Sequence, residues 1–138
     1  MANLPFSEVY IKKTSKLKDF DIPSYQTDEA AGVDLSASIE NSIKIHPWER
    51  EIIPCGISIA IPRGLEAQIR PRSGLAFKNG ITILNTPGTI DSDYRGEIKV
   101  VLINLSNTSF AINPGDRIAQ MIFANTIHVE FEEVDDLE

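Results

Sequence analysis

The chain has 138 residues, of which 42% are hydrophobic, and this is enough for one compact domain with an apolar core but not for two. It carries 13 basic and 20 acidic residues, a net charge of −7, and six of the acids lie within residues 130–138, where there is no base. The remaining 14 acids are nearly balanced by the 13 bases, so the chain lacks the basic surplus that a non-specific nucleic-acid-binding protein needs.

The first residues, MANLPFSEVY, have neither the basic flank nor the apolar stretch of a signal peptide. No apolar run in the chain approaches the roughly 18 residues of a membrane-spanning helix. Cys55 is the only cysteine, which excludes a disulfide within the chain and is typical of a reducing compartment. We therefore expect a cytoplasmic protein that does not bind membranes.

Proline and glycine residues divide the chain into short segments. These breakers stand at Pro23, Pro47, Pro54–Gly56, Pro62–Gly64, Pro71, Asn79–Gly80, Pro87–Gly88 and Asn113–Gly115. Between them, residues 57–61 and 65–70 alternate apolar and polar side chains, which is the pattern of half-buried strands. Many short strands separated by turns predict an all-β sandwich, jelly roll or barrel.

Residues 73–78 are the one segment that departs from the β pattern. Ser73 at its front is a favourable N-cap residue, and Asn79–Gly80 behind it tolerates the left-handed backbone conformation. We therefore predict a short helix here.

The last third of the chain contains two further predicted strands. Residues 97–105 are apolar on both faces beyond their first positions, which predicts a strand in the middle of the core or at a subunit contact. Residues 117–124 are also rich in β-forming side chains. Val129 and Phe131 alternate with acids, and the later apolar residues are isolated, so the acidic end is the only candidate for disorder.

The tripeptide Arg72-Ser73-Gly74 combines features that suit a phosphate group. The start of a helix offers unpaired backbone N–H groups, Arg72 adds a fork-shaped cation, and Gly74 allows an anion to approach the backbone closely. On the pattern alone, an ordinary capped turn with a solvated arginine is the simpler explanation of these residues.

Residues 88–96 place two acids, Asp91 and Asp93, two positions apart. In an extended segment their side chains would point the same way, whereas in a turn they would diverge. A carboxylate here is a candidate general base for water. The alternative is a hairpin turn that is rich in Asp, Ser and Gly because such residues suit turns.

Three other features suggest structural roles. Trp48 is expected to be a packing anchor rather than a stacking platform. Cys55 is a weak candidate nucleophile, because no histidine stands near it and nothing in the sequence indicates a lowered pKa. The basic residues Lys12, Lys13, Lys16 and Lys18 are expected to form a solvated face.

Four segments stand in order along the chain: residues 31–35 (AGVDL), 71–76 (PRSGLA), 88–97 (GTIDSDYRGE) and 115–120 (GDRIAQ). Together they resemble four of the five motifs of the trimeric dUTP diphosphatases (dUTPases), at a spacing like that of the family. The resemblance implies a distorted β-barrel or jelly roll with one short helix, assembled as a homotrimer with sites at subunit contacts. Residues 1–129 would form this single domain, and residues 130–138 an acidic C-terminal segment.

The resemblance also implies an activity. It is the hydrolysis of dUTP to dUMP and pyrophosphate by water attack at the α-phosphate, with Mg²⁺ on the triphosphate. Such an enzyme lowers dUTP and supplies dUMP for thymidylate synthesis. Neither nucleic acid nor a membrane is an expected partner.

The same motifs imply roles for single residues. Asp91 matches the family's water-activating residue, which also receives the sugar 3′-hydroxyl, and Tyr94 matches the ring under the deoxyribose, where a ribose 2′-hydroxyl would collide. The positions that match the uracil pocket are Asn85 and the backbone of Lys99, with Thr89 and Ile90 beside them. The positions that match phosphate contacts are Arg72, Ser73, Gly74 and Gln120. Asp34 matches the acid that approaches the metal through water.

The fifth motif of the family is a glycine-rich arm with an Arg and a Phe that folds over the nucleotide, and residues 121–138 contain no match to it. We expect a disordered arm to follow the acidic segment, and a much lower rate without it. Two alternatives stay open: a dCTP deaminase of similar fold, and a non-catalytic trimeric module that binds deoxynucleotides. Residues 88–97 favour the dUTPase over the deaminase, and Asp91 with Tyr94 argues against a pure binding module.

Overall fold

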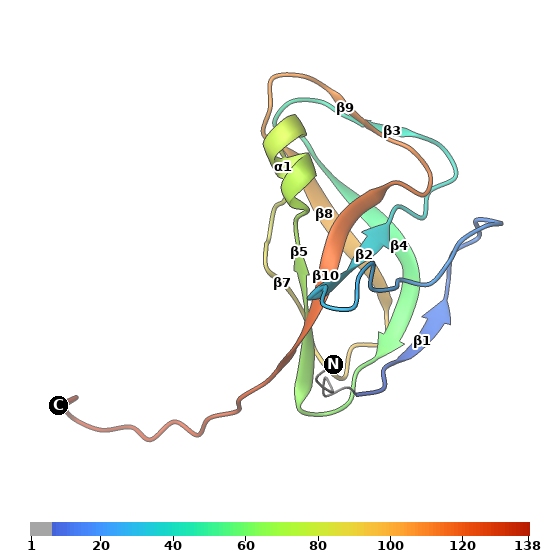
Figure 1. The fold of residues 1–138 in the computed structure, drawn as a ribbon. Coiled ribbons are helices and arrows are strands. Elements are labelled where there is room, and N and C mark those ends of the chain that lie inside the picture. The colour runs from blue at the N-terminus through green and yellow to red at the C-terminus, as the bar shows by residue number, and fades with distance from the viewer. Residues whose placement is uncertain (1–6) are drawn as a thin grey trace.

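The computed structural model describes residues 7–138, in which ten strands and one helix form an all-β architecture (Figure 1). The elements are β1 (Tyr10–Lys13), β2 (Gly32–Ser36), β3 (Ile43–Ile45), β4 (Arg50–Ala60), β5 (Leu65–Arg70), α1 (Ser73–Asn79), β6 (Ile81–Ile83), β7 (Gly88–Ile90), β8 (Glu97–Asn104), β9 (Phe110–Ile112) and β10 (Arg117–Asn125). The prediction of an all-β fold with one short helix is confirmed. Residues 1–6 lie outside the described residues. They belong to the predicted domain and to the N-terminal segment in which no signal peptide was recognised.

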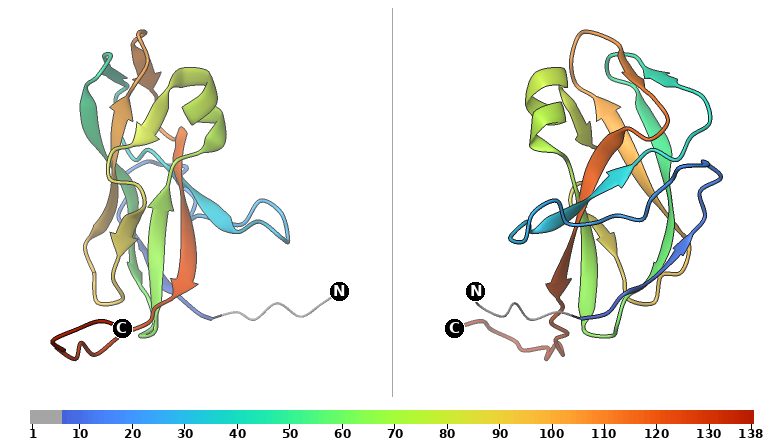
Figure 2. Two further views of the ribbon diagram at one scale, coloured as in Figure 1. Left: turned by 90° about the vertical axis from the view of Figure 1, so that its left-hand side faces the viewer. Right: turned by 45° about the vertical axis from the view of Figure 1, so that its right-hand side comes forward.

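The strands form two four-stranded antiparallel sheets that face each other as two layers (Figure 2). One sheet has the order β1-β4-β8-β6 and the other β2-β10-β5-β7, while β3 and β9 pair at one end of the molecule beside α1. Alternate side chains of both sheets point into one apolar core. Its fully buried members include Leu35, Ile53, Ile57, Ala67, Ile98, Leu102, Ile112 and Ala119.

Strand β4 continues past the predicted breaker Pro54–Gly56 without ending, so the prediction of a turn at these residues is wrong. The pairing of β4 with β8 shifts register between Pro54 and Ser58, which is the mark of a β-bulge. Gly56 has a φ of +73° at this point, and a Cβ there would lie 2.7 Å from the Cβ of Ser15. The bulge therefore accommodates the positive φ of Gly56, and it allows the long strand to bend without ending.

Strand β8 lies between β4 and β6 and confirms the prediction of a central strand. Ile98, Val100 and Leu102 point inward and are buried. The opposite face is less covered, because Val101 and Ile103 are half-buried and Leu105, just beyond the strand, is exposed. Both faces of β8 are apolar, but only the inner face contributes to the core, while the outer face stays partly accessible to solvent.

Helix α1 spans Ser73–Asn79 and ends as predicted, because Gly80 adopts the left-handed conformation with a φ of +65° and donates its N–H to Ala76 O. The predicted N-cap is wrong by one residue. Arg72 holds the N-cap position with extended backbone, and no side chain caps the helix. The Ser73 hydroxyl therefore makes no capping bond, and the first N–H groups of α1 have no side-chain acceptor from the cap.

Asn104 is the one fully buried polar side chain of the described core, and its amide is saturated with hydrogen bonds. Its Nδ2 donates to Ile45 O and Thr108 O, both at 2.9 Å, and its Oδ1 accepts from Ser106. Its backbone carbonyl accepts the N–H of Trp48, whose φ is +67°. Trp48 is 73% exposed, so the prediction of a packing anchor within the chain is wrong: the turn directs the indole outward.

The side chain of Cys55 is buried, in agreement with the expectation of a poor nucleophile. Burial raises the pKa of its thiol from 9.0 to about 12, and the negative charge of Glu97 adds to the increase. Because the folded protein holds this proton more tightly than the unfolded chain, the resulting stabilisation is complete below pH 9.0 and is lost as the pH rises through about 12.

We therefore expect the free energy of unfolding to fall between pH 9 and 12, and to fall less steeply in Cys55→Ala. Urea unfolding at a series of pH values measures both slopes. The cavity that alanine leaves lowers the free energy of unfolding by the same amount at every pH. It therefore does not affect the comparison of the two slopes. Equal slopes in the two proteins would contradict the assignment to Cys55.

Residues 126–138 contain no helix or strand, and in Figure 1 they run away from the barrel as an extended segment. Thr126 still donates its N–H to Gly64 O, after which the side chains are exposed. Lys12, Lys13, Lys16 and Lys18 are all exposed, so the prediction that they are solvated is confirmed, but Lys12 and Lys13 are consecutive in β1 and do not share one face. Within residues 7–138, no helix has the length and apolar character to cross a membrane.

Candidate active site

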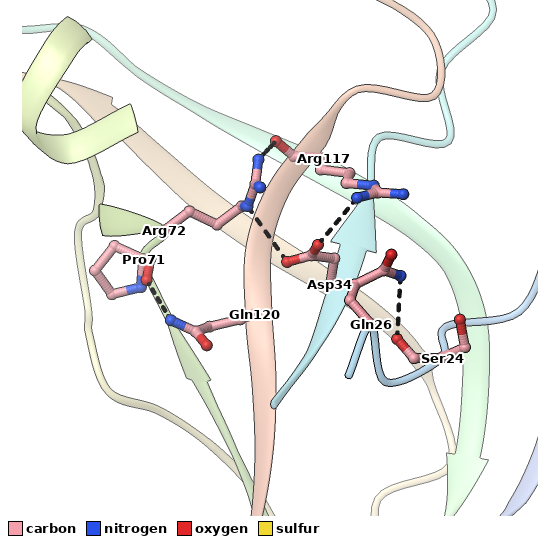
Figure 3. A network of polar contacts seen from close by, with 7 residues as sticks. All are labelled: Ser24, Gln26, Asp34, Pro71, Arg72, Arg117 and Gln120. Carbon is pink, nitrogen blue, oxygen red and sulfur yellow. Dashed lines mark hydrogen bonds and ion pairs between the residues drawn. The ribbon is translucent and has the colours of Figure 1, made fainter. Parts of the chain in front are cut away.

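Asp34 on β2 lies between two arginines from distant parts of the chain (Figure 3). Its Oδ1 is 3.3 Å from Nε of Arg72, and its Oδ2 is 3.6 Å from Nη1 of Arg117. Arg72 also donates from Nη1 to the backbone carbonyl of Arg117, at 3.3 Å. Two nitrogens of the Arg72 guanidinium are therefore held, which orients this cation at the start of α1.

The register of the second sheet explains why these residues meet. Gln120 on β10 pairs with Asp34 on one side and with Arg70 on the other, so three segments far apart in sequence share one level of the sheet. The Gln120 amide donates to Pro71 O at 3.0 Å and ties the turn before α1 to β10 (Figure 3). The structure thus brings together Asp34, Arg72 and Gln120, as the motifs imply.

Ser73 and Gly74 form the first turn of α1 beside this cluster, and both are exposed. A Cβ added at Gly74 would meet no atom within 4 Å, so the space over its backbone is open. An incoming anion would find the uncapped N–H groups, the Ser73 hydroxyl and the Arg72 guanidinium on one side of the molecule. We refer to Asp34, Arg72, Ser73, Gly74, Arg117 and Gln120 as the cationic cluster.

Arg117 is the member of this cluster that sequence reasoning did not single out. It lies inside the matched segment GDRIAQ, in which the resemblance gave a role to Gln120 alone. The signal that identifies it is the pairing of β10 with β2, which places Arg117 opposite Ser36, close to Asp34. That pairing is a property of the folded sheet and has no counterpart in the spacing of residues along the chain.

The second group of predicted residues lies on β6, β7, β8 and their connections. Asn85 follows β6 in the connection to β7, and its Nδ2 would lie at an ordinary contact distance of 3.5 Å from a Cβ at Gly88. The Thr86–Pro87 peptide within it is cis. Thr89 and Ile90 lie on β7, with Thr89 exposed and Ile90 half-buried, and Lys99 lies on β8.

Asp91 directly follows β7 and begins a turn, so the choice between strand and turn for the two acids is settled in favour of the turn. The N–H of Tyr94 donates to Asp91 O at 3.1 Å, and the Tyr94 hydroxyl donates to Glu97 O at 2.9 Å. Arg95 donates from Nη1 to the carbonyls of Ser92 and Tyr94, at 2.7 and 3.0 Å. We refer to residues 91–97 as the aspartate turn.

The cationic cluster and the aspartate turn lie at opposite ends of β5. Ile90 pairs with Ala67, so Asp91 is level with Glu66, whereas Arg72 lies beyond Arg70. Six positions separate Glu66 from Arg72, four of them within β5, and Arg72 itself has extended backbone, so the separation corresponds to about 20 Å at the usual rise per residue. One nucleotide bound to a single copy of the chain would not have both Asp91 and Arg72 at its α-phosphate.

The hollows of the surface show the same separation. Asp34 and Arg117 border a hollow of about 510 Å³, and Arg72 and Arg117 border one of about 360 Å³. Asp91 borders a different hollow of about 750 Å³, together with Arg63, Glu66 and His128. None of these three hollows is lined by both Arg72 and Asp91.

A cage of protein ligands for a metal ion is absent from the described residues. Within residues 7–138, no group of three or more His, Cys, Asp or Glu side chains is placed to hold one. Asp34 is the carboxylate in the cationic cluster, and both of its oxygens face arginines. Residues placed in this way would meet a Mg²⁺ ion through water and not as direct ligands, because Mg²⁺ commonly keeps several waters.

Known proteins resemble this chain in both sequence and fold. A family model described as dUTPase matches residues 18–138. The deoxyuridine 5'-triphosphate nucleotidohydrolase of Cytophaga hutchinsonii is 53% identical over 136 residues, which are 99% of this chain and 86% of that protein.

Solved structures agree on the fold. The dUTPase of Staphylococcus bacteriophage 80alpha with dUPNHPP superposes with a TM-score of 0.85 at 21% identity, covering 96% of this chain and 91% of that chain. A variant dUTPase from phage phi11 of S. aureus, described as coordinating a structural Mg(II) ion, has a TM-score of 0.84 at 20% identity, covering 96% of this chain and 99% of that chain. The two-layered β architecture is therefore that of a dUTPase.

Proposed function

The chain belongs to the dUTPase family, and on this premise we propose that it hydrolyses dUTP to dUMP and pyrophosphate by water attack at the α-phosphate. The observation that carries the proposal is the aspartate turn, in which one hydrogen-bonded turn joins a carboxylate, Asp91, to an aromatic ring, Tyr94. A module that only binds a nucleotide has no need of a carboxylate to activate water. The product dUMP would serve thymidylate synthesis.

Asp91 acts as the general base in this proposal. Its carboxylate takes a proton from water as the water oxygen forms a bond to the α-phosphorus. The bond from the α-phosphorus to the oxygen that bridges to the β-phosphate breaks, and pyrophosphate leaves with that oxygen. Asp91 is exposed, so a substrate and a water molecule have access to it from solvent. The same carboxylate receives the sugar 3′-hydroxyl.

The base binds at the segment that runs from the end of β6 to β8. Asn85 and the backbone of Lys99 bind the uracil edge, with Thr89 and Ile90 beside it. A Cβ added at Gly88 would lie at ordinary contact distance, 3.5 Å, from Asn85 Nδ2, which is compatible with a pocket closed around the base. Such a pocket rejects a 5-methyl group, because added volume in a close-packed site clashes. Tyr94 lies under the deoxyribose, where a ribose 2′-hydroxyl would collide.

The cationic cluster binds the triphosphate. Arg72 presents an oriented guanidinium, Ser73 a free hydroxyl, and Gly74 an open backbone. Gln120 adds a further phosphate contact next to Pro71. Arg72 stabilises the negative charge that grows on the phosphates as the bond breaks. Mg²⁺, when bound to the substrate, neutralises and orients the phosphates, with Asp34 approaching it through water.

Because the two groups lie about 20 Å apart in one chain, we propose that each active site combines the aspartate turn of one copy with the cationic cluster of another. A cyclic homotrimer satisfies this requirement, since head-to-tail contacts close into a ring and repeat the same site. No nucleic acid and no membrane takes part. The substrate is an intracellular nucleotide, and a cytoplasmic location follows from it.

The outer face of the β1-β4-β8-β6 sheet is the proposed contact between copies. Val101 of β8 pairs with Ile52 of β4, Ile103 pairs with Arg50, and Leu105 lies just beyond the strand. Ile52 is 57% exposed and Leu105 45%, so this face leaves large apolar side chains in contact with solvent in a single copy. The folded unit ends at residue 129 in this proposal, and residues 130–138 form the acidic segment that leads toward an arm.

We expect pyrophosphate release from dUTP but not from dCTP, dTTP or UTP when each is incubated with the chain and Mg²⁺. The base pocket excludes the methyl and amino variants, and Tyr94 excludes the ribose. Coupled detection of pyrophosphate measures the four rates side by side. Deamination of dCTP would place the chain with the deaminases, and tight binding of dUTP without release would make it a binding module.

A further inference from the structure

We propose that Gly96 is a specificity-determining position: the absence of a side chain there allows the Tyr94 ring to lie on the Gly96 backbone. That placement sets the position of the ring toward the sugar and thereby the preference for a deoxyribose over a ribose. The inference rests on the proposed place of Tyr94 under the deoxyribose. Gly96 itself contacts the ring and acts through it, so it is a positioning residue.

The distances at Gly96 leave no room for a methyl group. A Cβ there would lie 2.6 Å from Oη of Tyr94, 2.8 Å from Cζ and 3.1 Å from Cε1. All three atoms belong to the outer part of one side chain, while no backbone atom is among these nearest neighbours. An alanine at this position therefore displaces the ring and leaves the course of the chain unchanged.

The backbone conformation does not explain the glycine. Among the described residues, the glycines with positive φ are Gly56, Gly64, Gly80 and Gly115. Gly96 is not one of them, so an alanine at position 96 has no strain in its own φ. The ring of Tyr94 is the neighbour that this glycine accommodates.

The ring is held at its far end as well. Its hydroxyl donates to Glu97 O at 2.9 Å, and Glu97 is fixed in turn, because its backbone pairs with Ser58 and its carboxylate accepts the Thr14 hydroxyl at 2.8 Å. On the other side, Arg95 holds the carbonyl of Tyr94. Tyr94 is 41% exposed, so part of the residue remains accessible to a ligand.

Gly96→Ala pushes the ring off this support and breaks the alignment of its hydroxyl with Glu97. We expect the ratio of kcat/KM for dUTP to kcat/KM for UTP to fall by about tenfold or more, since misplacing a positioning group by about 1 Å costs up to 10²-fold. Steady-state kinetics with both nucleotides measures the ratio. General loosening of the fold would lower both values alike, and an unchanged ratio would overturn the inference.

The matched control is the same substitution in a chain that lacks the ring. In the Tyr94→Ala background, Gly96→Ala has nothing to displace, and we expect the ratio to change by less than about twofold. An equal loss in both backgrounds would overturn the inference, because the ring would then not be the cause.

A nucleotide-free measurement separates this inference from the proposed function. We expect Gly96→Ala to shift the NMR signals of the Tyr94 ring while the signals of the core strands stay in place. If the unaltered chain does not hydrolyse dUTP, the proposed function fails, and the ring signals still decide whether Gly96 positions Tyr94. Unchanged ring signals would overturn the inference whatever the activity of the chain.

Discussion

Asp91→Asn should lower kcat for dUTP hydrolysis by about 10²- to 10⁴-fold while nucleotide binding is retained. The amide has nearly the shape of the carboxylate, but it is not a base, so water attacks without losing its proton to the protein. The turn itself depends on the Asp91 backbone carbonyl, which accepts the Tyr94 N–H and is unaffected by the substitution. Pyrophosphate release gives kcat, and calorimetric titration with dUMP gives binding.

Asp93→Asn is the matched control for this prediction. Asp93 is exposed and lies two residues further along the same turn. Its replacement by asparagine removes the same unit of negative charge. We expect Asp93→Asn to keep kcat within about threefold of the unaltered chain, because surface charges away from the reacting atoms act only weakly through solvent. Equal losses in the two variants would assign the effect to the charge of the turn and not to a base at Asp91.

The local elements were predictable from the sequence wherever side-chain periodicity decides the structure. Residues 65–70 alternate strictly, and β5 has these bounds. Gly80 ends α1 because the left-handed conformation there is open to glycine. In both cases the deciding interaction lies within a few residues, so a short window of sequence contains it.

The errors arise where a distant part of the chain decides the local structure. The Pro54–Gly56 breaker becomes a bulge because β8 pairs on both sides of it, and that pairing compensates for the interrupted ladder. Trp48 points outward because its N–H is bound by Asn104, which lies far along the chain in β8. Periodicity around residues 48 and 54 contains no sign of either partner.

The proposed site residues divide in the same way. Their identities come from the motif resemblance, but their arrangement depends on sheet register. Asp34, Arg72 and Gln120 meet because β2, β5 and β10 are neighbours. Arg72 and Asp91 stand in neighbouring segments of the chain, but they lie at the two ends of β5. The reason is that β7 runs antiparallel to β5 and returns the chain to the level at which β5 begins. Their separation is the physical reason for assigning them to different copies of the chain.

Two inactive variants should therefore restore activity to each other. Arg72→Ala removes a phosphate-binding cation, which should cost about 10²- to 10³-fold in kcat, and Asp91→Asn removes the base. When equal amounts of the two chains assemble at random, one of the three sites in each mixed trimer, and about one quarter of all sites, combine an intact aspartate turn with an intact cationic cluster. We expect pyrophosphate release at about that fraction of the unaltered rate after the chains are unfolded together and refolded.

The control is the same pair of variants refolded separately and then mixed, which should stay inactive as long as the trimers do not exchange subunits. Subunit exchange is followed by mass spectrometry of a mixture in which one chain carries a heavy isotope. If mixed trimers form and remain as inactive as their parents, each active site belongs to one chain. The separation along β5 would then have to close by movement within the protomer, against the antiparallel pairing of β5 with both β7 and β10. Recovered activity would instead show that the sheet register, which keeps Asp91 and Arg72 apart in one copy, is what makes the assembly necessary for catalysis.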